Sequence, residues 1–377
     1  MVTMASTPKA SASTELWIAL LGRRDTPADG LQDYCTFLGE ALARHGVQLK
    51  FARVEWVERG WIPALSQVWR ESTNWRGKWV LLQYTAMGWS RRGFPLGALA
   101  TLAIARGRGA RCAVVFHEPF GLSGPRWINR VRESCQNWVV RSLHRFAHKC
   151  VFTIPLETVP WLEKAEHKSV FAPIGANIPE PVSAPNVERK EAPKTVAVFC
   201  LSEPPNRERE VRDISNAIRR IAHNGKKPRV IFLGRGTAEA RDDIDRAFAS
   251  ISAEIVNLGK RPAEEVSRTL AAADAMLCVR GELFARRGSA IAGVACSLPI
   301  VGYGDAAKMF PLGEAGLYLV PLGSGDALGT ALDEVLTDSS LRERLRKKSM
   351  RAQRRYFSWD VIAEKFCRAL WDMLENH

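Results

Sequence analysis

Short, continuously apolar runs recur along the first half of the chain, and longer stretches with helical periodicity separate them. The runs occupy residues 16–22, 47–54, 79–84, 112–116, 150–154 and 170–174. In the stretch 31–45, apolar residues recur near the helical period of about 3.6 residues, at Leu31, Phe37, Leu38, Ala41 and Leu42. Apolar strands that are each followed by a helix are typical of a parallel sheet with both faces covered. The pattern therefore predicts an α/β domain.

The periodicity stops at residues 178–193, a stretch with four prolines and several charged residues. We interpret this stretch as an interdomain linker. Beyond it, apolar runs resume at 196–201, 230–233, 255–258, 275–279, 299–302 and 317–320. The sequence thus predicts two doubly wound α/β domains of similar size, which would face each other across a cleft as in a bisubstrate enzyme.

The last helical pattern, at residues 358–374, places its apolar residues on one stripe, at Trp359, Ile362, Phe366, Leu370 and Leu374. An exposed stripe of this length would favour aggregation, so we expect it to dock on the rest of the protein. The predicted organisation is a disordered tail at 1–14, an N-terminal Rossmann-like domain at 15–177, the linker at 178–193, a C-terminal Rossmann-like domain at 194–357 and a C-terminal helix at 358–377.

The charge balance narrows the choice of partners. Lys and Arg number 54 against 40 Asp and Glu, which gives a net charge of +14. Such a surplus favours nucleotide phosphates, nucleic acid or an anionic membrane surface as partners. No nucleic-acid-binding motif accompanies the charge, so we do not expect nucleic acid as a partner.

Other classes of protein are not favoured by the sequence. The longest apolar stretch, at residues 96–105, is shorter than the roughly 20 residues that a membrane-spanning helix needs. The eight cysteines form no C-x-x-C pair and the seven histidines no H-E-x-x-H motif, so no metal site is expected. Cysteines within apolar runs indicate free thiols in a reducing compartment. We therefore expect a cytoplasmic protein, or one bound peripherally to the inner face of the membrane.

The strongest local signal for chemistry lies at residues 279–303. A predicted strand is followed by a loop with Arg286, Arg287 and Gly288, and a helix is expected to begin near Ser289. Helix N-termini attract anions through free N–H groups and the helix dipole, and arginine binds phosphate in a bidentate manner. The segment predicts a diphosphate site; the alternative is that Ser289 is an ordinary N-cap and the arginines are solvated.

A second candidate site is His117-Glu118, directly after the predicted strand 112–116. Ligands of doubly wound sheets bind at the carboxyl ends of the strands. His117 could position a sugar hydroxyl or stabilise developing charge, or it could simply bond the turn. Glu118 is either a further catalytic group or a solvated carboxylate.

Two glycine-containing loops are weaker candidates. Gly30 follows the first strand and would allow close approach of a phosphate or an acceptor, while Asp29 beside it could be only a helix cap. Gly234, paired with Gly236, would either contact the donor or form a tight turn between strand and helix.

The segment 126–149 combines an apolar helical face with flanking arginines. The face comprises Ile128, Val131, Cys135, Trp138, Val139, Leu143 and Phe146. One interpretation is a helix docked on the core with a solvated basic edge. The other is a membrane-surface patch near an acceptor site.

Taken together, these segments resemble GT-B glycosyltransferases, specifically the retaining family-4 group. The resemblance covers nearly the whole chain and includes Leu298-Pro299-Ile300-Val301, the Ile231–Gly236 segment, Pro173–Asn177 and Phe357-Ser358-Trp359. It implies a nucleotide-sugar donor bound by the C-terminal domain, a glycan, lipid-linked or small-molecule acceptor, and a last helix that returns to the N-terminal domain. It also implies that His117 contacts the sugar, that Arg207 with Arg286 or Arg287 neutralises the leaving diphosphate, and that no metal cofactor is needed.

The sequence departs from this family at several positions. The family has two glutamates separated by seven residues, and the corresponding residues here are Phe284 and Ala292. Glu282 offers a carboxylate two residues away, and Ser297 stands where the family has glycine. Arg207 or Arg209 replaces the family's usual Arg and Lys. Two functions therefore remain open: a glycosyltransferase, and a catalytically impaired GT-B protein that binds nucleotide or regulates a partner.

Overall fold

The computed structural model describes residues 14–25, 29–121, 124–162, 167–181, 193–223 and 225–371. The chain divides into two compact units. Unit 1 comprises Met1–Ala172 and Ala363–His377, and unit 2 comprises Pro173–Ile362. Residues 173–177, expected in the N-terminal domain, are thus assigned to unit 2. Most of the predicted linker and tail lie outside the described residues.

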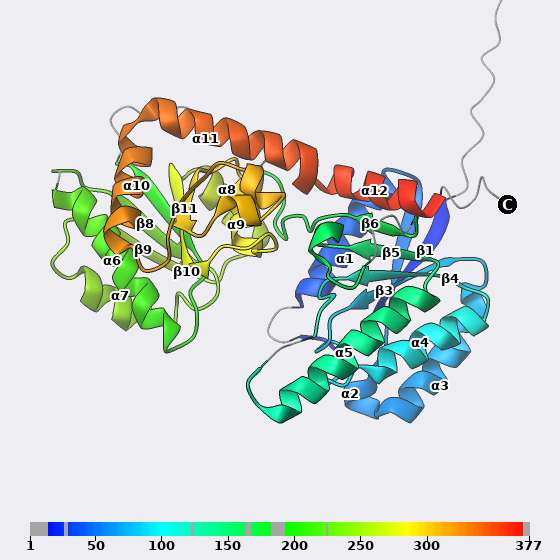
Figure 1. Cartoon of the computed structure of the whole chain (residues 1–377). Helices are drawn as coiled ribbons and strands as arrows, with labels where there is room; N and C mark the ends of the chain where they lie inside the picture. Colours follow the sequence, from blue (N-terminus) through cyan, green and yellow to red (C-terminus); the bar gives the residue numbers. More distant parts are fainter. Residues whose placement is uncertain are drawn as a thin grey trace, which may run out of the picture. The chain divides into compact units, whose positions relative to one another are not determined.

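Unit 1 contains a six-stranded sheet in the order β2-β1-β3-β4-β5-β6, with every pair parallel (Figure 1). Its strands are β1 (Glu15–Leu21), β2 (Val47–Arg53), β3 (Trp79–Tyr84), β4 (Arg111–Phe116), β5 (Lys149–Phe152) and β6 (Ser169–Phe171). All six apolar runs of the first half therefore form strands. Every residue of β3 is buried, as expected for a central strand covered on both faces.

Helices cover both faces of this sheet. They are α1 (Gly30–Ala43), α2 (Trp56–Arg59), α3 (Trp61–Glu71), α4 (Leu96–Gly107), α5 (Trp127–Phe146) and the final helix α12 (Trp359–Trp371), with short 3-10 turns at Ser72–Trp75 and Leu156–Thr158. Successive strand residues face opposite ways, so Ile18 and Leu20 join the core beneath α3, α4 and α5. Figure 1 shows these three helices side by side on one face.

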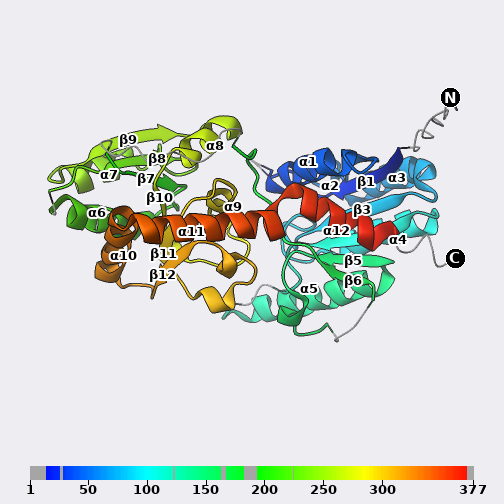
Figure 2. The same cartoon turned by 90° about the horizontal axis from the view of Figure 1, so that it is seen from above.

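Helix α12 contributes its later residues to unit 1. The Trp371 ring meets Trp17 of β1 edge to face at 6.4 Å, and its Nε1 donates to Glu15 Oε2 at 2.6 Å. Phe366 and Leu370 on the same helix are fully buried. The described part of the apolar stripe is thus a packed face, and Leu374 lies outside the described residues. The helix lies over the strands on the α1 side of the sheet (Figure 2).

Unit 2 contains a second parallel sheet in the order β12-β11-β10-β7-β8-β9. Its strands are β7 (Thr195–Phe199), β8 (Arg229–Leu233), β9 (Glu254–Gly259), β10 (Ala275–Glu282), β11 (Ile300–Tyr303) and β12 (Leu317–Val320). These six strands again match the six apolar runs of the second half. The prediction of two doubly wound parallel sheets is confirmed.

The helices of unit 2 form a layer on each side of its sheet. They are α6 (Asn206–His223), α7 (Arg241–Phe248), α8 (Ala263–Ala271), α9 (Gly288–Ala295), α10 (Gly325–Thr337) and α11 (Ser339–Ala352), followed by a π-helix, η5 (Gln353–Phe357). Short 3-10 turns occupy Ala306–Lys308 (η3) and Leu312–Glu314 (η4). Helices α6, α7 and α10 share one core, and α8, α9 and the end of α11 share the other.

Ser297, which replaces the family's glycine, ends α9 in a left-handed conformation with φ 57°. Its N–H bonds to the carbonyl of Val294, and the N–H of Leu298 bonds to that of Gly293. This pair of bonds is the Schellman motif, which places a positive φ on the residue after the helix. The serine therefore makes this left-handed turn at some cost in backbone strain.

Replacing Phe366 by alanine tests the packing of α12. The change leaves a cavity beside the sheet, so we expect unit 1 to lose about 3–5 kcal/mol of stability. Hydrogen exchange of the β1 amides measures this loss.

The matched control is Trp127→Ala, since Trp127 is an aromatic residue of unit 1 that is 74% exposed. Its removal should change the stability by no more than about 0.5 kcal/mol. Unchanged protection of β1 in the Phe366→Ala protein would contradict the packing described for α12.

Candidate functional site

In unit 2 the strand order reverses between β7 and β10, which lie side by side. Such a switch point is where doubly wound sheets bind ligands. At this position a β-bulge interrupts β10 between Cys278 and Glu282, with Gly281 at φ 69°. Bulges of this kind re-aim neighbouring side chains, and Arg280 is one of the three residues between Cys278 and Glu282.

Three arginines gather at this strand end, and we call them the arginine cluster: Arg209, Arg280 and Arg287. Arg280 Nε donates to Ser202 Oγ at 3.3 Å, and Arg287 Nη2 donates to the carbonyl of Arg280 at 3.0 Å. Arg209 Nη2 donates to the Val279 carbonyl at 3.3 Å. Guanidinium groups from α6, β10 and the loop before α9 therefore converge on one strand end.

A buried carboxylate, Glu210, lies beneath the arginine cluster. The residue is fully buried, and its Oε2 accepts a hydrogen bond from the Ser202 N–H at 2.8 Å. Its Oε1 lies 3.9 Å from Arg209 Nη2. Burial, and then repulsion by Arg280, lowers the pKa of Arg287 from its usual value. One carboxylate beneath three guanidinium groups leaves the strand end positively charged, which favours an anionic ligand.

A small pocket opens at the same strand end. It is lined by Phe199, Cys200, Leu277, Cys278, Val279, Arg280, Leu283, Arg287 and Ser289. Its free volume of about 10 Å³ suits a single water molecule. Cys200 at its rim has φ 68°, an uncommon conformation for a residue other than glycine. Strained residues of this kind cluster at functional sites.

Helix α9 begins at Gly288, and Arg287 occupies its N-cap position without a side-chain cap bond. The interpretation of Ser289 as the N-cap is therefore wrong; Ser289 lies in the first turn and lines the pocket. Gly288 is exposed, with open space where a side chain would be. The first turn of α9 thus presents backbone N–H groups without a side-chain cap, as an anion site requires.

Phe284 and Ala292, which replace the paired glutamates, have structural roles. The Arg287 guanidinium lies 4.3 Å from the centre of the Phe284 ring, a cation–π contact. Ala292 is buried within α9. Glu282 is exposed at the end of β10, and Arg286 is half-buried in the following loop.

Arg207 pairs with a residue of α7 and not with the elements of the arginine cluster. Its Nε donates to Asp243 Oδ2 of α7 at 3.0 Å, and both side chains are largely covered. Arg209, which the sequence offered as the alternative, is the residue at the strand end. Of the two, Arg209 is therefore the arginine of α6 that lies at the end of β10.

Gly234 serves the turn after β8. It has φ 94°, and a Cβ there would lie 2.7 Å from Cys200 Sγ. The Thr237 hydroxyl donates to the Gly234 carbonyl at 2.9 Å. These contacts support the tight-turn interpretation, because the glycine is needed for close packing against the end of β7.

In unit 1 the strand order reverses between β1 and β3, and His117 follows the next strand, β4. His117 is buried, and its Nε2 lies 2.9 Å from Oε1 of Gln83, a fully buried residue of β3. Because an amide oxygen can only accept, Nε2 is the donor in this contact. The Tyr34 ring packs edge to face on the imidazole at 4.9 Å. His117 is thus held in one orientation, and Gln83 is a site residue that the sequence analysis missed.

Glu118 is half-buried beside His117. Its Oε2 is buried and has no hydrogen-bond partner among the described residues. Burial, followed by the charge of Glu118, raises the pKa of Tyr84. The interpretation of Glu118 as a solvated carboxylate is therefore wrong for this oxygen.

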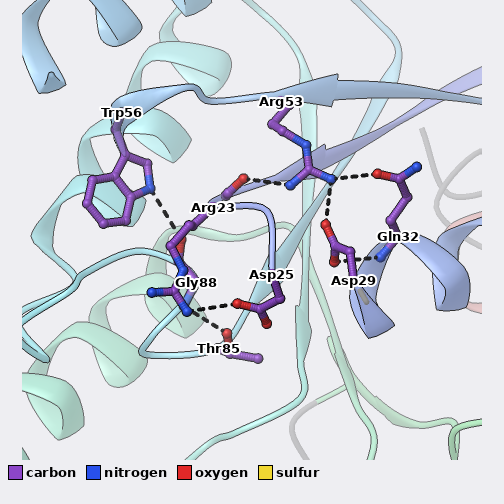
Figure 3. Close-up of polar contacts among 9 residues, drawn as sticks. Arg23, Asp25, Asp29, Gln32, Arg53, Trp56, Thr85 and Gly88 are labelled. Atoms are coloured by element: carbon purple, nitrogen blue, oxygen red, sulfur yellow. Dashed lines mark hydrogen bonds and ion pairs between the residues drawn. The ribbon is translucent and has the colours of Figure 1, made fainter. Parts of the chain in front are cut away.

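The loop after β1 is held by Arg53 at the end of β2 (Figure 3). Arg53 donates to the Gly22 carbonyl at 3.0 Å, to Asp29 Oδ2 at 2.8 Å and to Gln32 Oε1 at 2.9 Å. Asp29 Oδ1 accepts from the Gln32 N–H at 3.1 Å, so Asp29 is the helix cap. Gly30 is exposed at the start of α1 with open space around it.

Helix α5 buries one part of the apolar face that the sequence predicted for residues 126–149 and leaves another part exposed. Val139 and Leu143 are fully buried against the core. Trp127, Val131 and Trp138 are exposed by 74%, 47% and 58%. The helix is therefore both docked on the core and apolar on its outer surface.

Two further observations concern metals and membranes. Within the described ranges, no group of three or more His, Cys, Asp or Glu side chains is placed to hold a metal ion. None of the described helices combines the length and the apolar character needed to cross a bilayer.

Scanned against models of known protein families, the sequence matches none. The comparison with curated proteins also gives no match.

Solved structures share the fold over nearly the whole chain. A glycosyltransferase from Rickettsia africae ESF-5 has a TM-score of 0.68 at 12% identity, covering 97% of this chain and all of its own. Sucrose-phosphate synthase from Thermosynechococcus elongatus has a TM-score of 0.65 at 16% identity, covering 96% of this chain and 100% of its own. HepE of Anabaena in complex with UDP and glucose has a TM-score of 0.60 at 12% identity, covering 95% and 99%.

At such identities the likeness establishes the fold. Together with the two doubly wound parallel sheets, it confirms the predicted GT-B fold. The narrower assignment to the retaining family-4 group stays a prediction.

The glycines of the unit 1 loop offer a matched pair of substitutions. A Cβ on Gly22 would lie 2.3 Å from the Gly88 carbonyl oxygen, whereas a Cβ on Gly30 meets nothing within 4 Å. We expect Gly22→Ala to lower the free energy of unfolding by about 1–3 kcal/mol. Gly30→Ala should be neutral or raise it by up to about 1 kcal/mol. Urea denaturation of both proteins measures the difference, and equal effects would contradict the close approach at Gly22.

Proposed function

We propose that this protein is a glycosyltransferase that moves a sugar from a nucleotide-diphosphate sugar to an acceptor, with retention of the anomeric configuration. One observation carries the proposal: the arginine cluster at the switch point of unit 2. Guanidinium groups match the oxygens of a diphosphate in charge and geometry. The fold supports the same assignment, because solved structures that share it include glycosyltransferases and a complex of HepE with UDP-glucose.

The arginine cluster suits the charge that develops during transfer. The bond between the anomeric carbon and the diphosphate breaks, and that carbon forms a bond to the oxygen of an acceptor hydroxyl, whose proton passes to the departing diphosphate. Negative charge grows on the departing diphosphate, so fixed donors stabilise the transition state more than the ground state. We propose Arg209, Arg280 and Arg287 as these donors, together with the first turn of α9 at Gly288 and Ser289.

Arginines in this position supply positive charge without a metal ion, and we propose that transfer is independent of divalent cations. Glu282, exposed at the end of β10, is the carboxylate that we propose for contact with the transferred sugar. Arg286 in the same loop would add charge near the diphosphate.

In unit 1 we propose that His117 contacts the sugar or the acceptor hydroxyl. Gln83 holds Nε2 of His117 through the 2.9 Å contact, so the imidazole is oriented before a ligand binds. Glu118 is the neighbouring carboxyl group, and its Oε2 has no hydrogen bond within the described part of the chain. Such a group is available to a ligand hydroxyl.

The outer face of α5 supports a peripheral membrane contact, as the second part of the proposal. Arg130, Arg141 and Arg145 are exposed on the same helix as Trp127 and Trp138. A basic face with exposed tryptophan is typical of helices that lie on anionic membranes. A lipid-linked acceptor at the inner face of the membrane fits this surface.

Removing one guanidinium tests the donor site. We expect Arg287→Ala to weaken nucleoside diphosphate binding by about 1.5–3 kcal/mol, the usual contribution of a charge-assisted hydrogen bond. Isothermal titration calorimetry with UDP, GDP and ADP measures the loss. The control is Arg246→Ala on α7, a side chain that is 78% exposed; unchanged affinity in the Arg287→Ala protein would sink the donor-site proposal.

Turnover separates the two functions that the sequence left open. The unmodified protein should release nucleoside diphosphate from one of a panel of UDP-, GDP- and ADP-sugars, with or without EDTA. Nucleotide binding without release or transfer from any donor would instead favour a binding protein of the GT-B fold.

Vesicle sedimentation tests the surface of α5. We expect Trp127→Ser with Trp138→Ser to reduce binding to vesicles that contain anionic phosphatidylglycerol by about tenfold or more, because each buried aromatic ring contributes roughly 1.5–3 kcal/mol. Phe51→Ser is the control, since Phe51 is 46% exposed on β2. Equal binding by both variant proteins would contradict a membrane contact through α5.

A further inference from the structure

A second concentration of positive charge lies in unit 2, on elements that do not contribute to the arginine cluster. Helix α11 and the π-helix η5 carry eight Lys and Arg residues and a single acidic residue, Glu343. The basic residues are Arg342, Arg344, Arg346, Lys347, Lys348, Arg351, Arg354 and Arg355. The ratio of basic to acidic residues in this segment is much higher than in the whole chain, which has 54 Lys and Arg against 40 Asp and Glu.

Some of these cations have a structural role. Arg342 is buried, and its Nη1 donates to the carbonyls of Val335 and Leu336 at 3.1 and 3.0 Å. It thereby satisfies carbonyls at the end of α10. Lys347 pairs with Glu343 one turn earlier at 3.6 Å. These two residues need no ligand to account for them.

Four of the remaining cations, Lys348, Arg351, Arg354 and Arg355, line a cavity. Its walls are Gly313, Glu314, Lys348, Arg351, Ala352, Arg354, Arg355 and Tyr356, from η4, α11 and η5. The cavity has a volume of about 610 Å³, within the range of small-molecule sites. Gly313 in this wall packs closely against η3, because a Cβ there would lie 2.0 Å from the Ala306 carbonyl oxygen.

The charges of this cavity are not balanced by the protein. Lys348, Arg351 and Arg354 are exposed and form no ion pair with any residue that the structure describes. Arg355 lies 3.9 Å from Glu314, the one carboxylate in the wall, and 5.1 Å from the Tyr356 ring centre. Like charges that converge on a hollow repel one another unless an anion lies between them.

We propose that this α11 cavity binds a soluble, phosphate-bearing small molecule, such as a sugar phosphate. Lysine and arginine together favour phosphate oxygens, and the cavity has room for more than the phosphate group itself. The shape of this site distinguishes it from the basic surface of α5. Here the cations line one side of a hollow, whereas on α5 they lie on the same helix as exposed tryptophans that a membrane would cover.

The site is tested with inorganic pyrophosphate in the full-length protein that carries Arg287→Gln, so that the arginine cluster contributes little to the signal. Adding Lys348→Gln, Arg351→Gln and Arg354→Gln should weaken pyrophosphate binding at least about tenfold, since several charge-assisted bonds are lost. Glucose 6-phosphate, titrated in the same way, should also bind more weakly after the three added substitutions than to the Arg287→Gln parent.

The matched control carries Lys227→Gln, Arg241→Gln and Arg268→Gln, three exposed cations of unit 2 outside the cavity. Its net charge equals that of the cavity variant, and its affinity for pyrophosphate should stay close to that of the Arg287→Gln parent. An equal loss in both would overturn the proposal in favour of a diffuse electrostatic effect.

Two other outcomes would also overturn the proposal. One is the absence of any pyrophosphate binding in the Arg287→Gln parent. The other is binding to anionic vesicles that depends on Lys348, Arg351 and Arg354 while pyrophosphate binding does not, which would assign these residues to a lipid surface. Neither outcome bears on the arginine cluster, so the proposed transferase activity is tested separately.

Discussion

Parallel strand pairing is the constraint from which the rest of this structure follows. Every strand pair described in the two sheets is parallel, so the chain must return to the same edge before each new strand begins. The returning helices cover both faces, which is why the strands are buried runs of apolar residues. The same pairing brings all carboxyl ends of a sheet to one edge. That edge is where the arginine cluster forms in unit 2 and where His117 lies in unit 1.

The sequence predicted the strands well because burial on both faces leaves a strong apolar signal, and all twelve runs became strands. It predicted the site less well because side-chain direction depends on finer geometry. Arg207 and Arg209 are two residues apart on α6, and so they differ by about 200° in direction; only Arg209 reaches the strand end. Glu210 could have been found, because it lies one turn before Ile214 on the buried face of that helix. Gln83 stood out as the one amide in the apolar run 79–84, but the sequence does not show that His117 is its partner.

Positive charge gathers at three sites, the arginine cluster, α5 and α11, and the groups around the cations differ from site to site. In the arginine cluster, guanidinium groups donate to backbone carbonyls and lie above the buried carboxylate of Glu210. On α5, arginines lie on the same helix as exposed aromatic rings, and on α11 and η5 basic residues line one side of a hollow. Because the partner groups differ, the three places should respond differently to salt: surface charges are screened most and partly buried ones least. Total charge alone would not have distinguished them.

Helix α12 begins in unit 2 and ends in unit 1, and this arrangement has a consequence for biosynthesis. Unit 1 needs residues that the ribosome adds only after all of unit 2 has been made. Domains usually fold in the order of their synthesis, yet here the first unit emerges with the surface around Trp17 uncovered. Unit 2 therefore has the opportunity to complete its core first. That apolar surface of the nascent first unit stays uncovered until Trp371 has been synthesised.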